Sequence, residues 1–194
     1  YEMHELRPIK EMMPELMSKA AQVSVRVGKE DTPDLPPQTF VVRPIELEPS
    51  QRRVYDTLKA EWLVELQGQI ITAQTVLTEM SRLRQLASGF VYGPDGKALT
   101  VGKAKLDALQ GVLDEIGPQQ VVIFSVWQEE IRQIKAVLGD RARCVYGETP
   151  EGEKTEAIKA FQAGALQYLI LHPRSGGMGL NLQVASYVVW ASLD

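Results

Sequence analysis

A glycine-rich loop in the last quarter of the chain carries the residue types that could do chemistry. Its glycine and polar residues are Ser175, Gly176, Gly177, Gly179, Asn181 and Gln183. Glycines clustered where a strand ends let backbone N–H groups approach an anion closely, because no Cβ stands in the way. The hydroxyl of Ser175 can donate to a phosphate oxygen, and the side-chain amides add further donors and acceptors. The composition predicts either a phosphate-binding loop or a tight connection between two core strands.

Two short apolar runs flank this loop and must position it. Residues 169–171 precede it and residues 187–190 follow it. Apolar runs this short, bounded by Gly and Pro, predict buried strands. Upstream, the strand-like residues 121–125 and 143–146 alternate with helical patterns. Such alternation predicts right-handed βαβ units, and therefore an α/β fold with a parallel sheet and helices on both faces.

The expected helices between these strands have recognisable start signals. Ser125 and Gln128 have capping-box spacing for a helix that ends at Gly139. Thr149 and Pro150 supply an N-cap and a first-turn proline for the next helix. In open α/β sheets, ligands bind outside the carboxyl ends of the strands. The loops that lead into these two helices should therefore lie beside the glycine-rich loop.

The beginning of the chain is expected to be partly helical and partly extended. Residues 1–21 mix helix formers with two prolines, which indicates two short helical pieces. Residues 29–37 are polar and proline-rich, and they indicate an extended connector. Residues 39–47 predict a strand, at a sheet edge because Pro44 cannot donate to a ladder.

Three further helices are expected between this segment and residue 121. Ser50 is a suitable N-cap for the first helix. The apolar residues of this helix recur at helical spacing and so share one face. The residues of that face are Val54, Tyr55, Leu58, Trp62 and Leu66. Residues 72–88 form the second helix, and the third opens at residue 103. Arg82 and Arg84 lie off the apolar stripe of the second helix, so they face either solvent or a nucleic acid.

Composition narrows the class of protein. The chain has 194 residues, 44% of them hydrophobic and 24% charged, which is typical of a soluble globular protein. Its net charge of −4 excludes a uniformly basic surface, so any nucleic acid must bind to a local patch. The single cysteine, Cys144, cannot form an internal disulfide and fits a reducing cytosol. No apolar run is long enough to span a membrane, and nothing resembles a secretion signal.

The glycine-rich loop resembles a motif of a known family. The run from His172 to Gln183, followed by the strand at residues 187–190, resembles motif V of the second RecA-like lobe of superfamily-two helicases. The resemblance is strongest to the Swi/Snf-like DNA translocases, and above all to their phage- and prophage-encoded branch. Leu35 and Pro36, the spacing from Gln51 to Tyr55, and the helix that opens at residue 103 resemble the same family.

The resemblance implies roles for individual residues. The loops at residues 125–128, 147–149 and 172–183 match motifs IV, IVa and V, which lie toward the DNA track and the cleft between lobes. The implied DNA-backbone contacts are Ser125, Thr149, Ser175, Gly176 and Gly177. The implied nucleotide-cleft residues are Gly179, Asn181 and Gln183. Lys154 stands where the family usually has an arginine, so a bidentate contact at that position is in doubt.

The resemblance also implies a larger assembly. Residues 1–38 would be the end of lobe one and a connector, 39–102 a strand plus a helical segment, and 103–194 a truncated lobe two. Both ends look cut, so we expect a fragment of an ATP-dependent double-stranded DNA translocase from the cytoplasm of a bacterial or phage-infected cell. ATP and Mg²⁺ would bind mainly to the missing N-terminal lobe, because no phosphate-cradling loop of the Walker type occurs here. We expect no catalytic or metal-binding residue in this chain, and no ATP hydrolysis by the chain alone.

Two other classes of protein compete with this interpretation. A dinucleotide-binding oxidoreductase would need a full helix after the glycines, but only about a dozen residues separate Ser175 from Val188. A non-catalytic α/β module that binds nucleic acid or protein remains open, since it would lack Walker residues naturally. His172 has no nearby cysteine, and general priors favour a structural role over a ligand or base.

Overall fold

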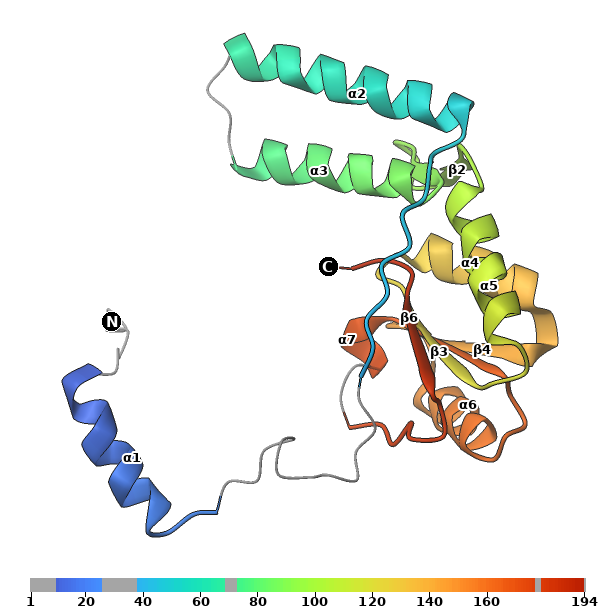
Figure 1. Ribbon diagram of the computed structural model, residues 1–194. Coiled ribbons are helices and arrows are strands. Elements are labelled where there is room, and N and C mark those ends of the chain that lie inside the picture. Colours follow the sequence, from blue (N-terminus) through green and yellow to red (C-terminus); the bar gives the residue numbers. More distant parts are fainter. Residues whose placement is uncertain (1–9, 26–37, 69–72, 177–178, 194) are drawn as a thin grey trace. The chain divides into compact units, whose positions relative to one another are not determined.

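The computed structural model describes residues 10–25, 38–68, 73–176 and 179–193 of the chain (Figure 1). The chain divides into two compact units, Tyr1–Arg43 and Pro44–Asp194, which are treated separately below. In the first unit, a 3-10 turn, η1 (Lys10–Met12), leads into α1 (Met13–Ala21). Pro14 stands in the first turn of α1, where its missing N–H leaves no intrahelical bond unmade. The prediction of a helical piece at Pro8 lies outside the described residues.

The strand predicted at residues 39–47 is wrong. Residues 38–48 have no regular secondary structure, and Phe40 and Val42 are 89% and 90% exposed. Alternating apolar residues form a strand only when another strand offers hydrogen-bonding partners. No strand among the described residues pairs with this segment, and Pro44 would interrupt such a ladder.

The second unit is built around a four-stranded parallel sheet. Its strands are β3 (Val121–Phe124), β4 (Ala142–Val145), β5 (Tyr168–Leu171) and β6 (Tyr187–Trp190), in the spatial order β4-β5-β3-β6. The register pairs the first residue of each strand with the first residue of its neighbour. All four strands therefore end together, at one edge of the sheet. The prediction of a parallel α/β sheet is confirmed.

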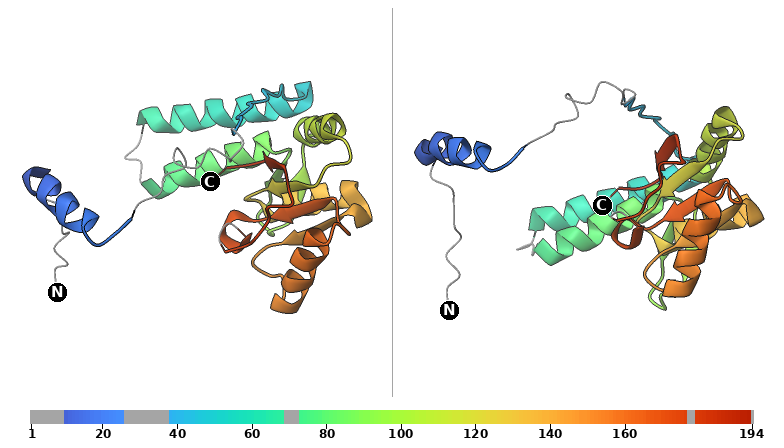
Figure 2. Two further views of the ribbon diagram at one scale, coloured as in Figure 1. Left: turned by 60° about the horizontal axis from the view of Figure 1, so that its bottom comes forward. Right: turned by 90° about the horizontal axis from the view of Figure 1, so that it is seen from below.

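Helices cover both faces of this sheet, as Figures 1 and 2 show. On one face lie α4 (Ala104–Ile116) and α5 (Gln128–Leu138), and on the other lies α6 (Glu151–Gln162). Successive side chains of β3 point to opposite faces: Ile123 packs with α4 and α5, and Phe124 packs with α6. A 3-10 turn, η3 (Gly139–Arg141), joins α5 to β4. Burial on two sides thus explains the apolar runs of β3 and β5, whereas the burial predicted for residues 187–190 is wrong, because β6 is an edge strand.

A helical hairpin and a small β-hairpin precede the sheet. The helices are α2 (Pro49–Gly68) and α3 (Ala73–Ala87), and β1 (Phe90–Tyr92) and β2 (Ala98–Thr100) pair antiparallel. The helix starting near residue 50 is confirmed, but the N-cap prediction for Ser50 is wrong, because the helix begins one residue earlier, at Pro49. Proline is favoured at the first helical position, where its fixed φ already suits the helix.

Polar contacts fasten the base of the helical hairpin. Gln51 is fully buried, and its Nε2 donates to the carbonyl oxygen of Leu86 at 2.6 Å. The Glu48 carboxylate accepts from the N–H of Lys103 at 2.7 Å, immediately before α4 begins. A Cβ at Gly102 would collide with Oε1 of Gln51, so only glycine fits there without a shift. The start of α2 is therefore held against both the end of α3 and the start of α4.

One edge strand of the sheet is largely open. β6 pairs with β3 on one side, and Tyr187, Val188 and Trp190 are 44%, 53% and 51% exposed. The rings of Trp190 and Phe124 are stacked, with their centroids 4.4 Å apart. No helix in the described part of the chain is long and apolar enough to cross a membrane.

Candidate nucleic-acid and nucleotide interface

The candidate site lies at the edge where the four parallel strands end. The loop after β3 leads into α5, the loop after β4 leads into α6, and the long loop after β5 runs to β6. Since the strands end in register, these loops emerge from the same side of the sheet. Most of the residues singled out from the sequence are therefore brought to one edge by the topology.

The loop after β5 opens with one helical turn, α7 (Pro173–Gly176), rather than with extended chain. His172 organises this turn. Its carbonyl oxygen accepts from the N–H groups of Ser175 at 2.9 Å and Gly176 at 3.0 Å. Its Nδ1 accepts from the N–H of Arg174 at 3.2 Å. The imidazole therefore acts as a cap for the turn, which agrees with the structural role expected for His172.

Of the two glycines predicted to bind a phosphate, only Gly176 lies among the described residues. Gly176 is buried, and a Cβ there would meet Cδ2 of Leu171 at 2.9 Å, so close packing on β5 alone accounts for glycine. Its N–H already donates to His172 within the turn. Ser175 is half-buried beside it. Gly177 lies outside the described residues, so the contact predicted for its N–H stays a prediction.

The rest of this loop alternates between buried and exposed side chains. Leu180, Leu182 and Ala185 pack against the core on the α6 side of the sheet. The three residues predicted to face the nucleotide cleft, Gly179, Asn181 and Gln183, are exposed. The backbone is pinned by a hydrogen bond of 2.7 Å from Gln162 Nε2 of α6 to the carbonyl oxygen of Asn181. The leucines thus anchor the loop while the predicted site residues share its outer side.

The loop after β4 presents Thr149. Its Oγ1 accepts from the N–H of Tyr146 at 3.0 Å, and its own N–H donates to the carbonyl oxygen of Tyr146 at 2.9 Å. The capping role predicted for Thr149 is wrong, because α6 begins at Glu151 and its N-cap residue is Pro150. Since Oγ1 is used as an acceptor and the residue is half-buried, its proton remains suited to donation to an anion.

The loop after β3 hides the hydroxyl of Ser125. Ser125 is fully buried, donates to Oε2 of Glu130 at 2.6 Å and accepts from the N–H of Trp127 at 3.3 Å. The capping box predicted for Ser125 and Gln128 is wrong, because the N-cap residue of α5 is Trp127. In this arrangement Ser125 orients its loop, and its hydroxyl is not turned toward a ligand.

A buried polar network around Glu130 was missed by sequence reasoning. Glu130 is buried, and its carboxylate pairs with Lys105 at 2.7 Å. The run of polar residues at the start of α5 suggests a solvated first turn. The available signal was periodicity, because Glu130, Ile134 and Leu138 recur every four residues and therefore share the inward face.

Two arginines on α3 differ in their surroundings. Arg84 lies over the ring of Trp127 at 5.9 Å, and the ring of Phe90 meets the same indole edge-on at 6.2 Å. Arg82 pairs with Glu79 at 2.9 Å on the surface. Arg84 thus packs across the junction between the hairpin and the sheet, and Arg82 lies on an exposed part of α3, where either solvent or a nucleic acid could face it.

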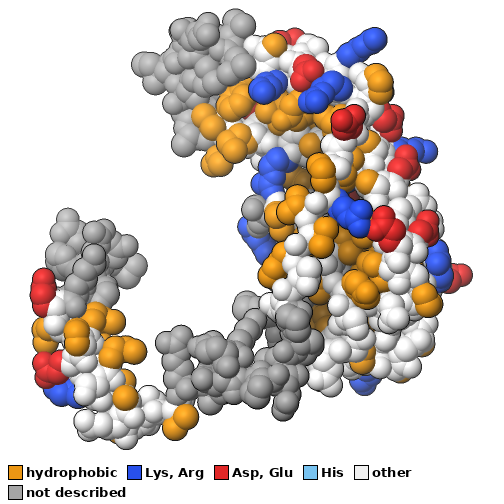
Figure 3. Space-filling view, in the orientation of Figure 1, with side chains coloured by type: hydrophobic (Ala, Val, Ile, Leu, Met, Phe, Trp, Pro, Cys, Tyr) orange, Lys and Arg blue, Asp and Glu red, His pale blue; other side chains and the backbone are white. Residues whose placement is uncertain are grey.

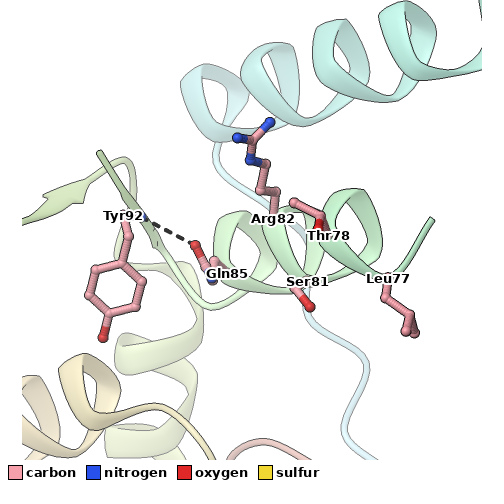
Figure 4. Close-up of a pocket in the computed structure, with 6 residues that line it drawn as sticks. All are labelled: Leu77, Thr78, Ser81, Arg82, Gln85 and Tyr92. Atoms are coloured by element: carbon pink, nitrogen blue, oxygen red, sulfur yellow. Dashed lines mark hydrogen bonds between the residues drawn. The ribbon is translucent and has the colours of Figure 1, made fainter. Parts of the chain in front are cut away.

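A shallow hollow of about 520 Å³ lies along α3. The residues that line it are Leu77, Thr78, Ser81, Arg82, Gln85 and Tyr92. Figure 4 shows that their side chains diverge, and that Gln85 accepts the N–H of Tyr92, at 3.2 Å. The hollow shares no residue with the carboxyl edge of the sheet. Within the described ranges, no group of three or more His, Cys, Asp or Glu residues could hold a metal ion.

Cys144 is the only thiol of the chain. It lies on β4 and is free and half-buried. Burial raises the pKa of its thiol above the usual value, with smaller opposing effects from Lys135 and Arg143. A raised pKa keeps the thiol protonated at neutral pH, so Cys144 acts as a small core side chain.

Comparison with known proteins agrees with this architecture. Residues 104–194 match the family described as helicase conserved C-terminal domain. The chain is 26% identical over 144 residues to protein p41 of Acyrthosiphon pisum secondary endosymbiont phage 1; the match includes 72% of this chain and 29% of that protein. The chain thus spans less than a third of the length of this relative.

Solved structures with the same fold come from Swi2/Snf2 ATPases. The C-terminal domain of the Sulfolobus solfataricus SWI2/SNF2 ATPase is similar with a TM-score of 0.62 and 18% identity, over 75% of this chain and 68% of that one. The Sulfolobus solfataricus SWI2/SNF2 ATPase core in complex with dsDNA is similar with a TM-score of 0.67 and 19% identity, over 92% of this chain and 41% of that one. Residues 104–194 therefore match the helicase C-terminal domain family, and the fold is that of the Swi2/Snf2 ATPase C-terminal domain, as the motifs predicted.

Proposed function

We propose that this chain is the second lobe of an ATP-dependent double-stranded DNA translocase, and that it works against a first RecA-like lobe. The observation that carries the proposal is the helicase C-terminal domain at residues 104–194, whose three loops meet at one edge of a parallel sheet. A neighbouring structure is a Swi2/Snf2 core in complex with dsDNA, which supports duplex DNA as the partner. The phage relative supports a place in the cytoplasm of a bacterial or phage-infected cell.

DNA would be held by its backbone. In this proposal the hydroxyls of Thr149 and Ser175 and the N–H of Gly177 contact phosphate oxygens. Ser125 and Gly176 act beneath them, because both are buried and their hydrogen-bonding groups are already engaged. Phosphate contacts position a protein without reading base sequence, which suits a motor that must move along any duplex.

ATP with Mg²⁺ would bind between the two lobes. Gly179, Asn181 and Gln183 form the exposed side of their loop, so a nucleotide held on a facing lobe could contact them. The metal ligands would come from that other lobe, since no suitable group occurs among the described residues. Hydrolysis of the bound nucleotide supplies the free energy for movement, and this chain contributes closure of the cleft and a grip on DNA.

The test compares ATP turnover with and without a first lobe. The 194-residue chain alone should release no phosphate above a no-protein blank, with or without DNA. Joined to a lobe that carries a Walker loop, it should hydrolyse ATP, and duplex DNA should raise the rate. The matched control is the first lobe alone. Turnover by the isolated chain, or a joined protein that no duplex stimulates, would contradict the proposal and favour a non-catalytic interaction module.

A further inference from the structure

The strongest unassigned feature is a buried ion pair at the carboxyl edge of the sheet. Lys105 Nζ lies 2.7 Å from Glu130 Oε1, and the two side chains are only 21% and 6% exposed. Lys105 also donates to Oγ of Ser88, at 2.9 Å, in the segment after α3. One residue at the start of α4 therefore links the end of the helical hairpin to the first turn of α5.

The second oxygen of Glu130 joins two strands. Oε2 accepts from Ser125, which follows β3, at 2.6 Å, and from Ser192, which follows β6, at 2.7 Å. Oγ of Ser192 in turn accepts from the N–H of Val126 at 2.9 Å. The N–H of Ala191 donates to the carbonyl oxygen of Phe124 at 2.8 Å. One carboxylate thus ties the chain leaving β6 to the chain leaving β3.

Stability alone does not explain such an arrangement. A buried carboxylate must be paired and hydrogen-bonded, because an uncompensated charge is strongly unfavourable. Glu130 meets that requirement with one ammonium and two hydroxyls. Well-packed apolar side chains of the same volume are often equally stable, so what a satisfied ionic network adds is a defined geometry.

We propose that Glu130 is a positioning residue for the interface. It fixes the direction in which the chain leaves β6 relative to the loop after β3, and Lys105 holds the carboxylate in place. For its effect on ATP turnover the inference rests on the proposed function, but its effect on local geometry does not. Glu129 supplies a matched control, because it is the neighbouring carboxylate and pairs with Arg132 at 3.5 Å.

The geometric test is amide hydrogen exchange on the 194-residue chain. In Glu130→Gln, the amides of Val126 and Ala191 should exchange about tenfold faster, while those of β5 change little, because local opening leaves the global fold intact. Glu129→Gln should leave all of them unchanged. If Glu130→Gln does not fold, Ser192→Ala answers the question with the amide of Ala191 as its readout, because this variant removes one hydroxyl from Glu130 and keeps the ion pair, whereas the amide of Val126 loses its own acceptor. Val126 and Ala191 amides as slow as those in Glu129→Gln would overturn the inference.

The functional test uses the chain joined to a first lobe. Glu130→Gln should lower the DNA-stimulated kcat about tenfold and leave KM for ATP within about twofold, since a mispositioned edge affects closure more than nucleotide capture. In the double variant Lys105→Met/Glu130→Gln, the melting temperature should recover but kcat should not. A kcat equal to that of Glu129→Gln, or one that recovers together with the melting temperature, would overturn the inference. A wild-type protein without DNA-stimulated turnover would instead refute the proposed function.

Discussion

The glycines of the loop after β5 look alike in the sequence, but in the structure glycine is required at each position by a different physical cause. Gly176 is required by packing against Leu171, whereas Gly179 has φ +74° in open space, a conformation that residues with a Cβ adopt less readily. The family resemblance implied a DNA phosphate contact for Gly176 and a nucleotide-cleft position for Gly179, because sequence alone does not show what a Cβ would meet. The interpretation of this loop as a packed connection therefore holds at Gly176.

Two glycine substitutions should change stability in opposite directions. Gly176→Ala should lower the free energy of unfolding by about 1–3 kcal/mol, because its Cβ would press on the side chain of Leu171. Gly111→Ala, on the exposed side of α4 with nothing within 4 Å, should raise it by about 0.5–1 kcal/mol. Urea unfolding of both variants measures the difference. A Gly176→Ala protein as stable as wild type would show that packing does not require glycine there.

Among the elements, apolar patterns predicted where helices and strands lie, whereas capping residues did not predict where the helices begin. Apolar spacing located α3 and α5, since burial on a fixed face repeats along a helix, and short apolar runs located β3, β5 and β6. The three predicted N-caps, Ser50, Ser125 and Thr149, are each displaced from the observed helix starts. A hydroxyl near a helix start has other nearby partners, such as the N–H of Tyr146 for Thr149.

The attachment of the helical hairpin should depend on Gln51. Gln51→Ala should lower the free energy of unfolding by about 0.5–1.5 kcal/mol, because it removes a buried hydrogen bond to the carbonyl oxygen of Leu86, which then keeps only the N–H of Gly89 as a donor. Gln110→Ala, on the exposed side of α4, should change it by less than about 0.5 kcal/mol. Thermal or urea unfolding measures both. Equal losses in the two variants would show that the hydrogen bond does not fasten the hairpin.

At the scale of the whole molecule, the sequence predicted the parallel sheet and the family but not the network around Glu130. Ser88, Lys105, Glu130 and Ser192 are far apart in the sequence, so no local pattern brings them together. The failed strand at residues 39–47 has a related cause, since pairing depends on a distant partner. Motif resemblance predicted the family but not this network, since neither Lys105 nor Ser192 was singled out by it.

The surface of the chain predicts weak DNA binding. On the face seen in Figure 3, Lys and Arg side chains are interspersed with Asp and Glu. If Lys or Arg side chains neutralise about three phosphates beside the proposed neutral donors, affinity for duplex DNA should fall about 40-fold between about 50 and 200 mM salt. Fluorescence anisotropy with two duplexes of unrelated sequence measures this, and both should give the same slope. Tight, salt-insensitive binding to one of the two would contradict a backbone grip.

The position of β6 has a consequence for how the lobe is made. β6 is the last described strand in the sequence, yet its partner is β3, the first strand of the sheet. A ribosome releases the amino-terminal part first, so β3, β4 and β5 can pack with their helices before β6 emerges. Glu130 then meets Lys105 early and Ser192 late. Until β6 pairs with β3, water can still reach the second oxygen of this carboxylate. Completion of the sheet and desolvation of Glu130 therefore happen in the same step.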